Sequence, residues 1–190
     1  MRIAIIGTGH IGSTLGGRFQ AAGHDVRYGS RNPGGAKPGS APQVTVGEAI
    51  SGAEVVVLAV PGSAVTDVIA ANGAALDGKV VIDAVNRMGA SEFNSHAAIA
   101  AAAPQARYVR AFNTLGWENF ADPPEGADLF FAADDAARPA AEELIRSVGL
   151  NPAYLGDAGA TGTVDGVLPL WFALVRQRGG HRRLAFRVLT

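Results

Sequence analysis

A glycine motif near the amino terminus constrains the fold of this chain more than any other feature. Gly7, Gly9 and Gly12 follow the apolar run at residues 3–6, and apolar side chains then recur every four positions over residues 11–19. A strand, a glycine turn and an amphipathic helix in this order are typical of the first unit of a dinucleotide-binding fold. The first glycine permits a tight turn, the second lets a pyrophosphate approach the backbone, and the third lets the helix pack against the strand. We therefore predict that the N-terminus of this helix binds the phosphates of a dinucleotide.

The end of the next predicted strand, residues 25–28, indicates which dinucleotide is bound. Units of this kind normally carry an acidic residue there that binds the ribose 2′-hydroxyl, but this chain has Ser30 and Arg31. A carboxylate would repel a 2′-phosphate, whereas a guanidinium donates several hydrogen bonds to it. The sequence therefore predicts NADP(H), the alternative being that Arg31 is a solvated loop residue. Lys37 is a second candidate cation, in a glycine- and proline-rich loop (residues 32–42) that we expect either to cover the adenosine end or to be mobile.

Composition excludes several other classes of protein. A chain of 190 residues suits one domain with at most a small appendage, and a net charge of −1 gives no general attraction for nucleic acid or an anionic membrane. The absence of cysteine excludes disulfides, thiolate metal sites and thiol nucleophiles. The longest apolar runs, residues 55–60 and 168–175, are too short to span a bilayer, and the amino terminus lacks the pattern of a signal peptide. We expect a cytoplasmic protein that binds neither nucleic acid nor membrane.

Strands alternate with helices along the rest of the chain. The predicted strands are residues 54–60, 79–83, 107–112, 128–132 and 151–155, and the predicted helices are residues 63–72, 91–103 and 134–148, the last with Asp134 as N-cap. This alternation predicts an α/β fold with a Rossmann-like, doubly wound, mostly parallel sheet and a small C-terminal helical extension. We assign residues 1–156 to an NADP-binding domain and residues 157–190 to the helical segment.

Three segments at strand ends are the candidates for function, because ligands bind at the carboxyl ends of the strands in such sheets. The segments are residues 59–61, 84–86, which end with Asn86, and 111–115. We expect residues 59–61 to pack against the ribose and nicotinamide half of the cofactor, and Asn113 and Thr114 to offer amide and hydroxyl groups beside the nicotinamide ring. The alternative is that the two asparagines are ordinary loop residues that satisfy backbone groups. The predicted cofactor-binding residues are Gly7, Thr8, Gly9, His10, Ile11, Gly12, Ser30, Arg31, Ala59, Val60, Pro61, Asn86 and Asn113.

No catalytic acid or base is evident in the sequence. The chain has no Ser-x-x-x-Lys or Tyr-x-x-x-Lys pair where a short-chain dehydrogenase places its proton donor, and its four histidines do not form a metal-ligand cluster. We therefore predict no metal, and we favour a reaction whose chemistry the cofactors carry themselves.

Motifs spread over nearly the whole chain carry a family resemblance. They are GTGHIG, YGSR, VVVLAVP, KVVIDAVN, RAFNTLGWENF, LFFAADD and LPLWFALVRQRGGHRRLAFRVL. Together they resemble the coenzyme F420-dependent NADP oxidoreductases, small proteins that pass hydride between NADPH and the deazaflavin F420. The resemblance implies that the two rings lie face to face, so that the protein contributes mainly orientation and water exclusion.

The resemblance also implies an acceptor cleft and an assembly. The cleft would be formed by the loop at residues 112–115 and by the C-terminal helix, and a homodimer would use the apolar segment 161–178, which we expect Pro169 to interrupt. The archaeal F420 enzymes carry a histidine where this chain has Asn113. Trp171 fits a core position equally well, because it belongs to an apolar stripe at helical spacing. The predicted acceptor-binding residues are Phe112, Asn113, Thr114, Leu115, Leu168 and Trp171.

Three functions are consistent with these observations. The first is an oxidoreductase that transfers hydride between NADP(H) and F420. The second is an NADPH-dependent reductase of another small acceptor, such as a C=N bond, a C=C bond or a flavin. The third is a non-enzymatic NADP-binding redox module. The lack of a visible acid or base fits the first and third better than the second.

Overall fold

The first strand and helix form where the glycine motif predicts them. The computed structural model describes residues 1–33 and 39–189, so Lys37 and the middle of its loop lie outside the described residues. β1 (Arg2–Ile6) runs through the glycine turn into α1 (His10–Ala21), and β2 (Asp25–Gly29) pairs with β1 in parallel. The remaining elements are β3 (Gln43–Val44), α2 (Val46–Ser51), β4 (Val55–Leu58), α3 (Val65–Leu76), β5 (Val80–Asp83), α4 (His96–Ala102), β6 (Arg107–Arg110), α5 (Glu118–Ala121), β7 (Asp128–Ala133), α6 (Arg138–Ser147), β8 (Asn151–Tyr154), the short 3₁₀ helix η1 (Ala158–Ala160) and α7 (Thr161–Gln177).

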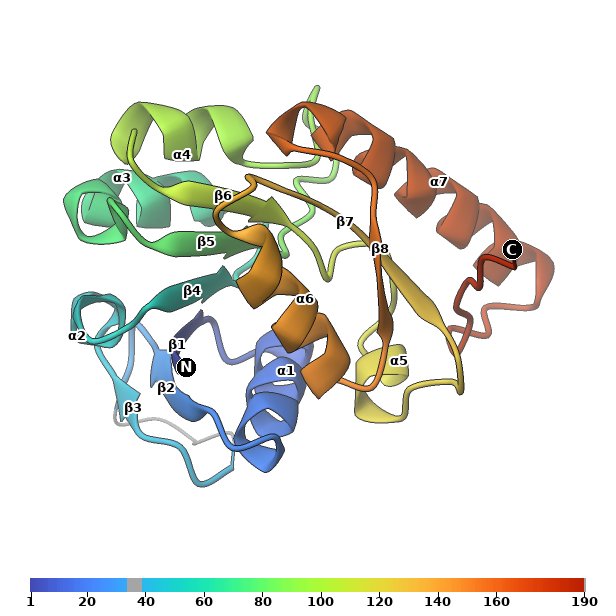
Figure 1. Ribbon diagram of the computed structural model, residues 1–190, viewed down its shortest axis with the longest axis horizontal. Helices are drawn as coiled ribbons and strands as arrows, with labels where there is room; N and C mark the ends of the chain where they lie inside the picture. The colour runs from blue at the N-terminus through green and yellow to red at the C-terminus, as the bar shows by residue number, and fades with distance from the viewer. Residues whose placement is uncertain (34–38, 190) are drawn as a thin grey trace.

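The strands form one twisted sheet in the order β3-β2-β1-β4-β5-β6-β7-β8 (Figure 1). All neighbours from β3 to β6 are parallel, whereas β7 pairs with β6 in the antiparallel direction and β8 is parallel to β7. The chain starts at the centre of the sheet, builds outward to β3, and then crosses back to β4. The predicted Rossmann-like, doubly wound, mostly parallel sheet with a C-terminal helix is therefore confirmed.

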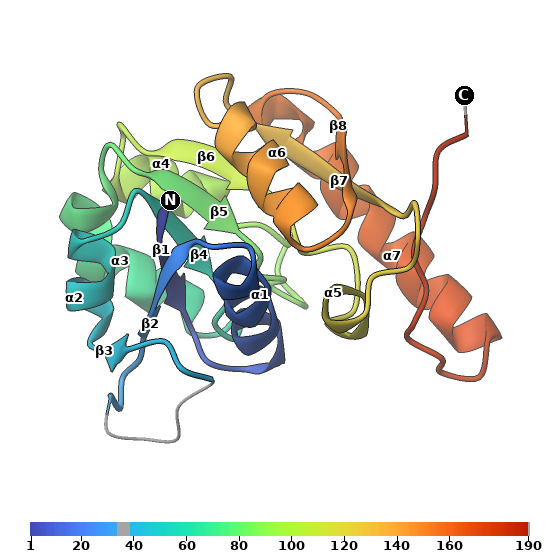
Figure 2. The same cartoon turned by 60° about the horizontal axis from the view of Figure 1, so that its bottom comes forward.

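Two apolar layers cover the two faces of the sheet. Alternate strand residues such as Ile5 and Val57 face α1 and α6, where they pack with Phe19 and other buried side chains. The intervening residues, such as Ile6 and Leu58, face the second layer, which α2, α3 and α4 cover. Figure 2 shows the two sets of helices on opposite sides of the strands. Burial on both faces is the reason why these strands are almost continuously apolar in the sequence.

Several boundaries differ from the sequence prediction for identifiable reasons. The strand predicted over residues 107–112 ends at Arg110, and Phe112 then adopts a left-handed backbone conformation with φ 63°. The helix predicted from Asp134 begins at Arg138, because the Asp134 carboxylate instead accepts a hydrogen bond from the Tyr108 amide at 2.6 Å. The helix predicted from residue 91 begins at His96. The short elements β3, α2 and α5 carry too little periodicity to be predicted.

The C-terminal helix α7 is continuous, so the expectation that Pro169 interrupts it is wrong. Leu168 and Trp171, on either side of the proline, are both buried, and this packing holds the helix through the position where a backbone donor is missing. Within the described residues, η1 and α7 together (Ala158–Gln177) are the one helical stretch long and apolar enough to cross a membrane. About a third of its most apolar window (33%) is buried against the rest of the protein, and core helices pass the same test.

His24 gives the stability of the fold a predictable pH dependence. Its ring lies between the amino group of Met1, 3.2 Å from Nδ1, and the Ser147 hydroxyl, 2.9 Å from Nε2. Burial lowers the pKa of His24 below its usual value, the Met1 charge lowers it further, and Glu143 opposes both effects. At a pH below about 6.5 the unfolded chain binds more protons at this histidine than the folded chain does. His24 therefore leaves the free energy of unfolding unchanged above about pH 6.5 and lowers it as the pH decreases below that value.

We expect His24→Gln to remove this part of the pH dependence. Urea unfolding of the wild type and the variant from pH 8 to pH 5 measures the effect. The control is His181→Gln, since His181 is exposed and should leave the slope unchanged. Parallel pH profiles for the wild type and His24→Gln would contradict the assignment.

Candidate functional site

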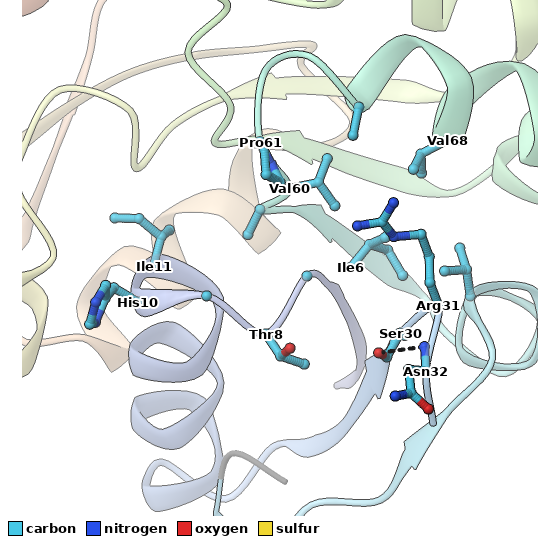
Figure 3. A pocket seen from close by; sticks show the side chains of 16 residues that line it. Ile6, Thr8, His10, Ile11, Ser30, Arg31, Asn32, Val60, Pro61 and Val68 are labelled. Atoms are coloured by element: carbon cyan, nitrogen blue, oxygen red, sulfur yellow. Dashed lines mark hydrogen bonds between the residues drawn. The ribbon is translucent and has the colours of Figure 1, made fainter. Parts of the chain in front are cut away.

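A cavity of about 500 Å³ lies at the carboxyl ends of β1, β2 and β4 (Figure 3). This is the edge of the sheet at which doubly wound folds bind ligands, next to the crossover from one half to the other. The walls of the cavity are formed by Ile6, Gly7, Thr8, Gly9, His10, Ile11, Gly29, Ser30, Arg31, Asn32, Val46, Ala59, Val60, Pro61, Ala64 and Val68. Of the predicted cofactor-binding residues, the structure brings all but Gly12, Asn86 and Asn113 to this cavity wall.

The three motif glycines serve three different purposes. Gly7 has φ +112°, and a Cβ there would lie 2.4 Å from the Ala59 carbonyl oxygen. A Cβ on Gly12 would lie 2.1 Å from the Gly7 carbonyl oxygen, so this glycine lets α1 pack against the loop. Gly9 differs from both, because a Cβ there would meet nothing within 4 Å. Gly7 and Gly12 are therefore required by the fold, whereas the open space above Gly9 is the space that a pyrophosphate needs.

The N-terminus of α1 is open to an anion. Its N-cap is Gly9, which has no side chain to accept a hydrogen bond from the first turn, and the first turn carries no acidic residue. The amide groups of that turn and the positive end of the helix dipole therefore face the cavity, and no side chain of residues 1–33 or 39–189 caps them. This arrangement fits a dinucleotide pyrophosphate.

Arg31 reaches into the cavity from the end of β2. Figure 3 shows its side chain extending past Ile6 toward Val68, with Thr8 and Ser30 opposite one another at the far side of the opening. The Ser30 hydroxyl accepts a hydrogen bond from the Asn32 amide at 3.1 Å. The described wall includes no Asp or Glu, so no carboxylate on it would repel a 2′-phosphate. The geometry therefore suits the phosphorylated dinucleotide that the sequence predicts.

The ring of His10 has a partner that the sequence did not reveal. It stacks on Trp117, just before α5, with ring centroids 5.0 Å apart and planes inclined by 17°. The stack joins the first turn of α1 to the loop that follows β6. The side chain of His10 is therefore an aromatic contact at the rim of the cavity, in addition to the role of its backbone at the helix N-terminus.

Asn86 and Asn113 meet beside the cavity rather than in its wall. Asn86 follows β5, Asn113 follows β6, and the Asn86 side-chain amide donates to the Asn113 carbonyl at 2.8 Å. The backbone after β5 also touches the loop that carries Pro61, since a Cβ on Gly62 would lie 2.6 Å from the Asn86 carbonyl oxygen. The Asn86 side chain thus binds backbone, as the alternative interpretation proposes, whereas the Asn113 side-chain amide donates to Asp165 Oδ1 at 3.2 Å. Their contact with the cofactor stays a prediction.

The predicted acceptor-binding residues are all buried in this structure, and each is at most 6% exposed. Trp171 lies in the core and its indole N–H donates to the Leu184 carbonyl at 2.8 Å, which favours the packing interpretation of this residue. Leu168 alone among the six lines a described surface cavity, a second one of about 390 Å³ with Met88, Phe93 and Phe172 among its walls. A direct role of the six residues in acceptor binding therefore stays a prediction.

A buried cluster of charged and amide groups lies where β5 and β6 end. Arg110 is fully buried, with its Nε 2.7 Å from Asp165 Oδ1 on α7 and its Nη1 3.4 Å from Asp83 Oδ1. The same guanidinium donates to the carbonyl oxygens of Asp83 at 3.0 Å and Val85 at 2.6 Å, and to Asn86 Oδ1 at 2.9 Å. Burial raises the pKa of Asp83, while the Arg110 charge opposes that rise. The sequence did not predict a buried arginine between two carboxylates. The one sign of it in the sequence is that Asp83 and Arg110 each end a strand and each lie between two apolar residues.

Comparisons with known proteins agree with this site. Residues 2–87 match the family described as "NADP oxidoreductase coenzyme F420-dependent". A hypothetical protein of known structure from Sinorhizobium meliloti is 32% identical, with a TM-score of 0.70 over 85% of this chain and 88% of the other. A structure from Arthrobacter sp. FB24, named as a candidate F420-dependent NADP-reductase, has a TM-score of 0.83 over 100% of both chains at 24% identity, which supports the fold.

A curated relative shares only part of its length with this chain. Rat metalloreductase STEAP3 is 27% identical over an alignment 185 residues long, which covers 90% of this chain and 38% of that protein. The chain therefore spans well under half of this relative. The glycine loop, the open helix N-terminus and Arg31 all lie within the matched 2–87 segment or at its cavity, and they agree with the NADP-dependent chemistry of the matched family. On these grounds residues 2–87 place the chain with the family of coenzyme F420-dependent NADP oxidoreductases, and the whole chain shares the fold of the Arthrobacter structure.

Proposed function

We propose that this protein transfers hydride between NADP(H) and the deazaflavin F420. The observation that carries the proposal is the cavity at the ends of β1, β2 and β4, with an uncapped helix N-terminus at one point and Arg31 at another. When bound there, NADPH would supply the hydride that reduces the deazaflavin, and one proton from solvent would complete the reduced acceptor. The description of the matched family supports F420 as that acceptor.

The described residues would mainly bind and orient the donor. The α1 N-terminus and the open space above Gly9 would hold the pyrophosphate, and Arg31 with Ser30 would hold the 2′-phosphate. Val60 and Pro61, at the end of β4, would support the ribose and nicotinamide half. No proton donor is required at the reacting carbons, because hydride passes directly between the two rings and the protein contributes orientation and exclusion of water.

The decisive experiment follows NADPH oxidation by the purified protein with F420, with FMN or FAD, and with no acceptor. The proposal expects turnover with F420 at a rate well above both other reactions, and much slower turnover when NADH replaces NADPH. Absence of F420 turnover, in a preparation that binds NADPH, would overturn it.

A free flavin is the second candidate acceptor. Asn113 favours it, since this residue stands where archaeal F420 enzymes carry histidine, and its side chain here is tied to Asp165 at 3.2 Å. Turnover with FMN or FAD and none with F420 would favour this second function. No turnover with any acceptor would favour a non-enzymatic redox module.

We also propose that the protein is a homodimer that pairs through α7. Leu170 on this helix is 52% exposed, although it is a large apolar side chain in the middle of the helix. Static light scattering of the protein separated by size measures the mass directly. A monomer at all concentrations would contradict the proposal.

A further inference from the structure

The buried cluster around Arg110 joins three separate parts of the chain. Asp83 ends β5, Arg110 ends β6, and Asp165 lies in the second turn of α7. Asp165 Oδ1 accepts from Arg110 Nε at 2.7 Å and from Asn113 Nδ2 at 3.2 Å, while its Oδ2 accepts from Asn94 at 2.8 Å. This one carboxylate therefore binds the strand end, the loop after β6 and the loop after β5.

The contribution of Asp165 differs from that of Asp83. The Asp83 carboxylate binds amides and a hydroxyl near its own strand, from Val85, Ser95 and Tyr108. Asp165 comes instead from a helix far along the sequence, and it is the acceptor for the Asn113 amide among the described residues. Without its charge, the buried guanidinium would keep a single carboxylate partner and the Asn113 side chain would lose its anchor.

The loops that Asp165 fixes lie at the nicotinamide end of the site. The register places Leu58, Asp83 and Arg110 side by side, so β4, β5 and β6 end together. The loop after β4 supplies Pro61 to the NADP cavity, and Gly62 packs directly against the backbone of Asn86. The adenosine end, in contrast, is held by β1, α1 and β2, which make no hydrogen bond to the Asp165 cluster within the described residues.

Two further observations together distinguish the loop after β6 from the other loops at this edge of the sheet. Phe112 has a left-handed backbone, with φ 63°, which a residue with a Cβ adopts only when its surroundings impose it. Asn113 Oδ1 and the Thr114 hydroxyl are buried with no hydrogen-bond partner in the described structure. Such features cluster at binding and catalytic sites.

We propose that Asp165 is a positioning residue for the nicotinamide half of NADP(H), acting through Arg110 and the loops that carry Asn86 and Asn113. The inference deepens the NADP-dependent hydride transfer proposed above. It gives α7 a part in the site although Asp165 does not line the described NADP cavity. The adenosine half is held independently, so the role of Asp165 should be visible as a difference between two ligands.

The test compares NADPH with adenosine 2′,5′-bisphosphate, which carries the 2′-phosphate but lacks the nicotinamide. In equilibrium titrations, Asp165→Asn should weaken NADPH binding about tenfold, or about 1.4 kcal/mol, because a buried charged hydrogen-bond acceptor is lost. The bisphosphate should bind within about twofold of wild type, by the independence of the adenosine half. The matched control is Asp135→Asn, an exposed carboxylate away from the cluster, which should change neither affinity.

A merely structural role would not produce this split. A structural role would lower the melting temperature. It would also either leave the affinities for NADPH and the bisphosphate unchanged or weaken the two equally. Either result, in a folded variant, overturns the proposal. If Asp165→Asn does not fold, Asn94→Ala decides, since it removes the hydrogen bond to Asp165 Oδ2 and leaves the charge. We then expect a selective loss of about threefold for NADPH, and equal effects on the two ligands overturn the proposal. These titrations measure binding without an acceptor. Their failure is therefore distinguishable from a failure of F420 turnover.

Discussion

Gly12→Ala is expected to destabilise the protein by about 3 kcal/mol, the cost of forcing a methyl group into a closely packed site. The new Cβ would lie 2.1 Å from the Gly7 carbonyl oxygen and 3.1 Å from Ile5 Cγ2. Because both neighbours belong to β1 and its turn, α1 must move away from the sheet and the glycine loop must open. Thermal unfolding should show a decrease in Tm of about 6–12 °C for a chain of this size, and NADPH binding should be lost with it.

Two other glycines provide the controls. Gly17→Ala lies on the same helix with nothing within 4 Å of its Cβ, so it should raise stability by about 0.5–1 kcal/mol through helix propensity. Gly9→Ala also meets nothing within 4 Å and should fold like the wild type. Its methyl group would nevertheless occupy the approach of the pyrophosphate, so we expect NADPH affinity to fall by about tenfold or more. A Gly12→Ala protein with wild-type Tm, or a Gly9→Ala protein with wild-type affinity, would show that the loop is used differently.

Arg31→Ala is expected to weaken NADPH binding about 10- to 100-fold and leave NADH binding within about twofold. This range corresponds to the loss of charge-assisted hydrogen bonds to one phosphate, about 1.5–3 kcal/mol. We expect this difference because the two dinucleotides differ only at the 2′-position, and Arg31 extends into the cavity from the end of β2, where we predict the 2′-phosphate to bind. Fluorescence titration with NADPH and with NADH measures both affinities on the same protein.

The control for this substitution is Arg27→Ala. Arg27 is an exposed arginine on β2, four positions before Arg31, and it does not line the NADP cavity. Its loss should change neither affinity, which separates a specific contact from a general loss of positive charge. Equal weakening of NADPH and NADH by Arg31→Ala would refute the role in 2′-phosphate recognition. So would full retention of NADPH affinity.

The donor half of the site could be predicted from sequence because it is built from adjacent residues. Gly7, Gly9 and Gly12 specify a backbone shape, and Arg31 follows the next strand by a fixed offset, so a short stretch of sequence defines most of the cavity. The parallel sheet could be predicted for a similar reason, since strands buried on both faces are apolar throughout.

The other half could not be predicted because its contacts join residues that are distant in the sequence. Arg110 and Asp165 are separated by 55 positions, and neither carries a local sign of its partner. The uninterrupted course of α7 through Pro169 likewise depends on tertiary packing, which outweighs the cost of a missing backbone donor. Trp171 illustrates the same difficulty, because an apolar stripe at helical spacing fits a core and a ligand pocket equally well, and only the structure shows the indole buried.

The close approach of Gly62 to the backbone of Asn86 leaves no room for a side chain between the loop after β4 and the loop after β5. On one side lies the cavity with Arg31 in its wall, and on the other lie the loops that Asp165 of α7 binds. Any side chain at position 62 would meet the Asn86 carbonyl oxygen at 2.6 Å and Arg87 Cα at 3.0 Å, so it would push these two loops apart. The spacing between the cavity wall and the Asp165 cluster therefore depends on the absence of a single Cβ atom.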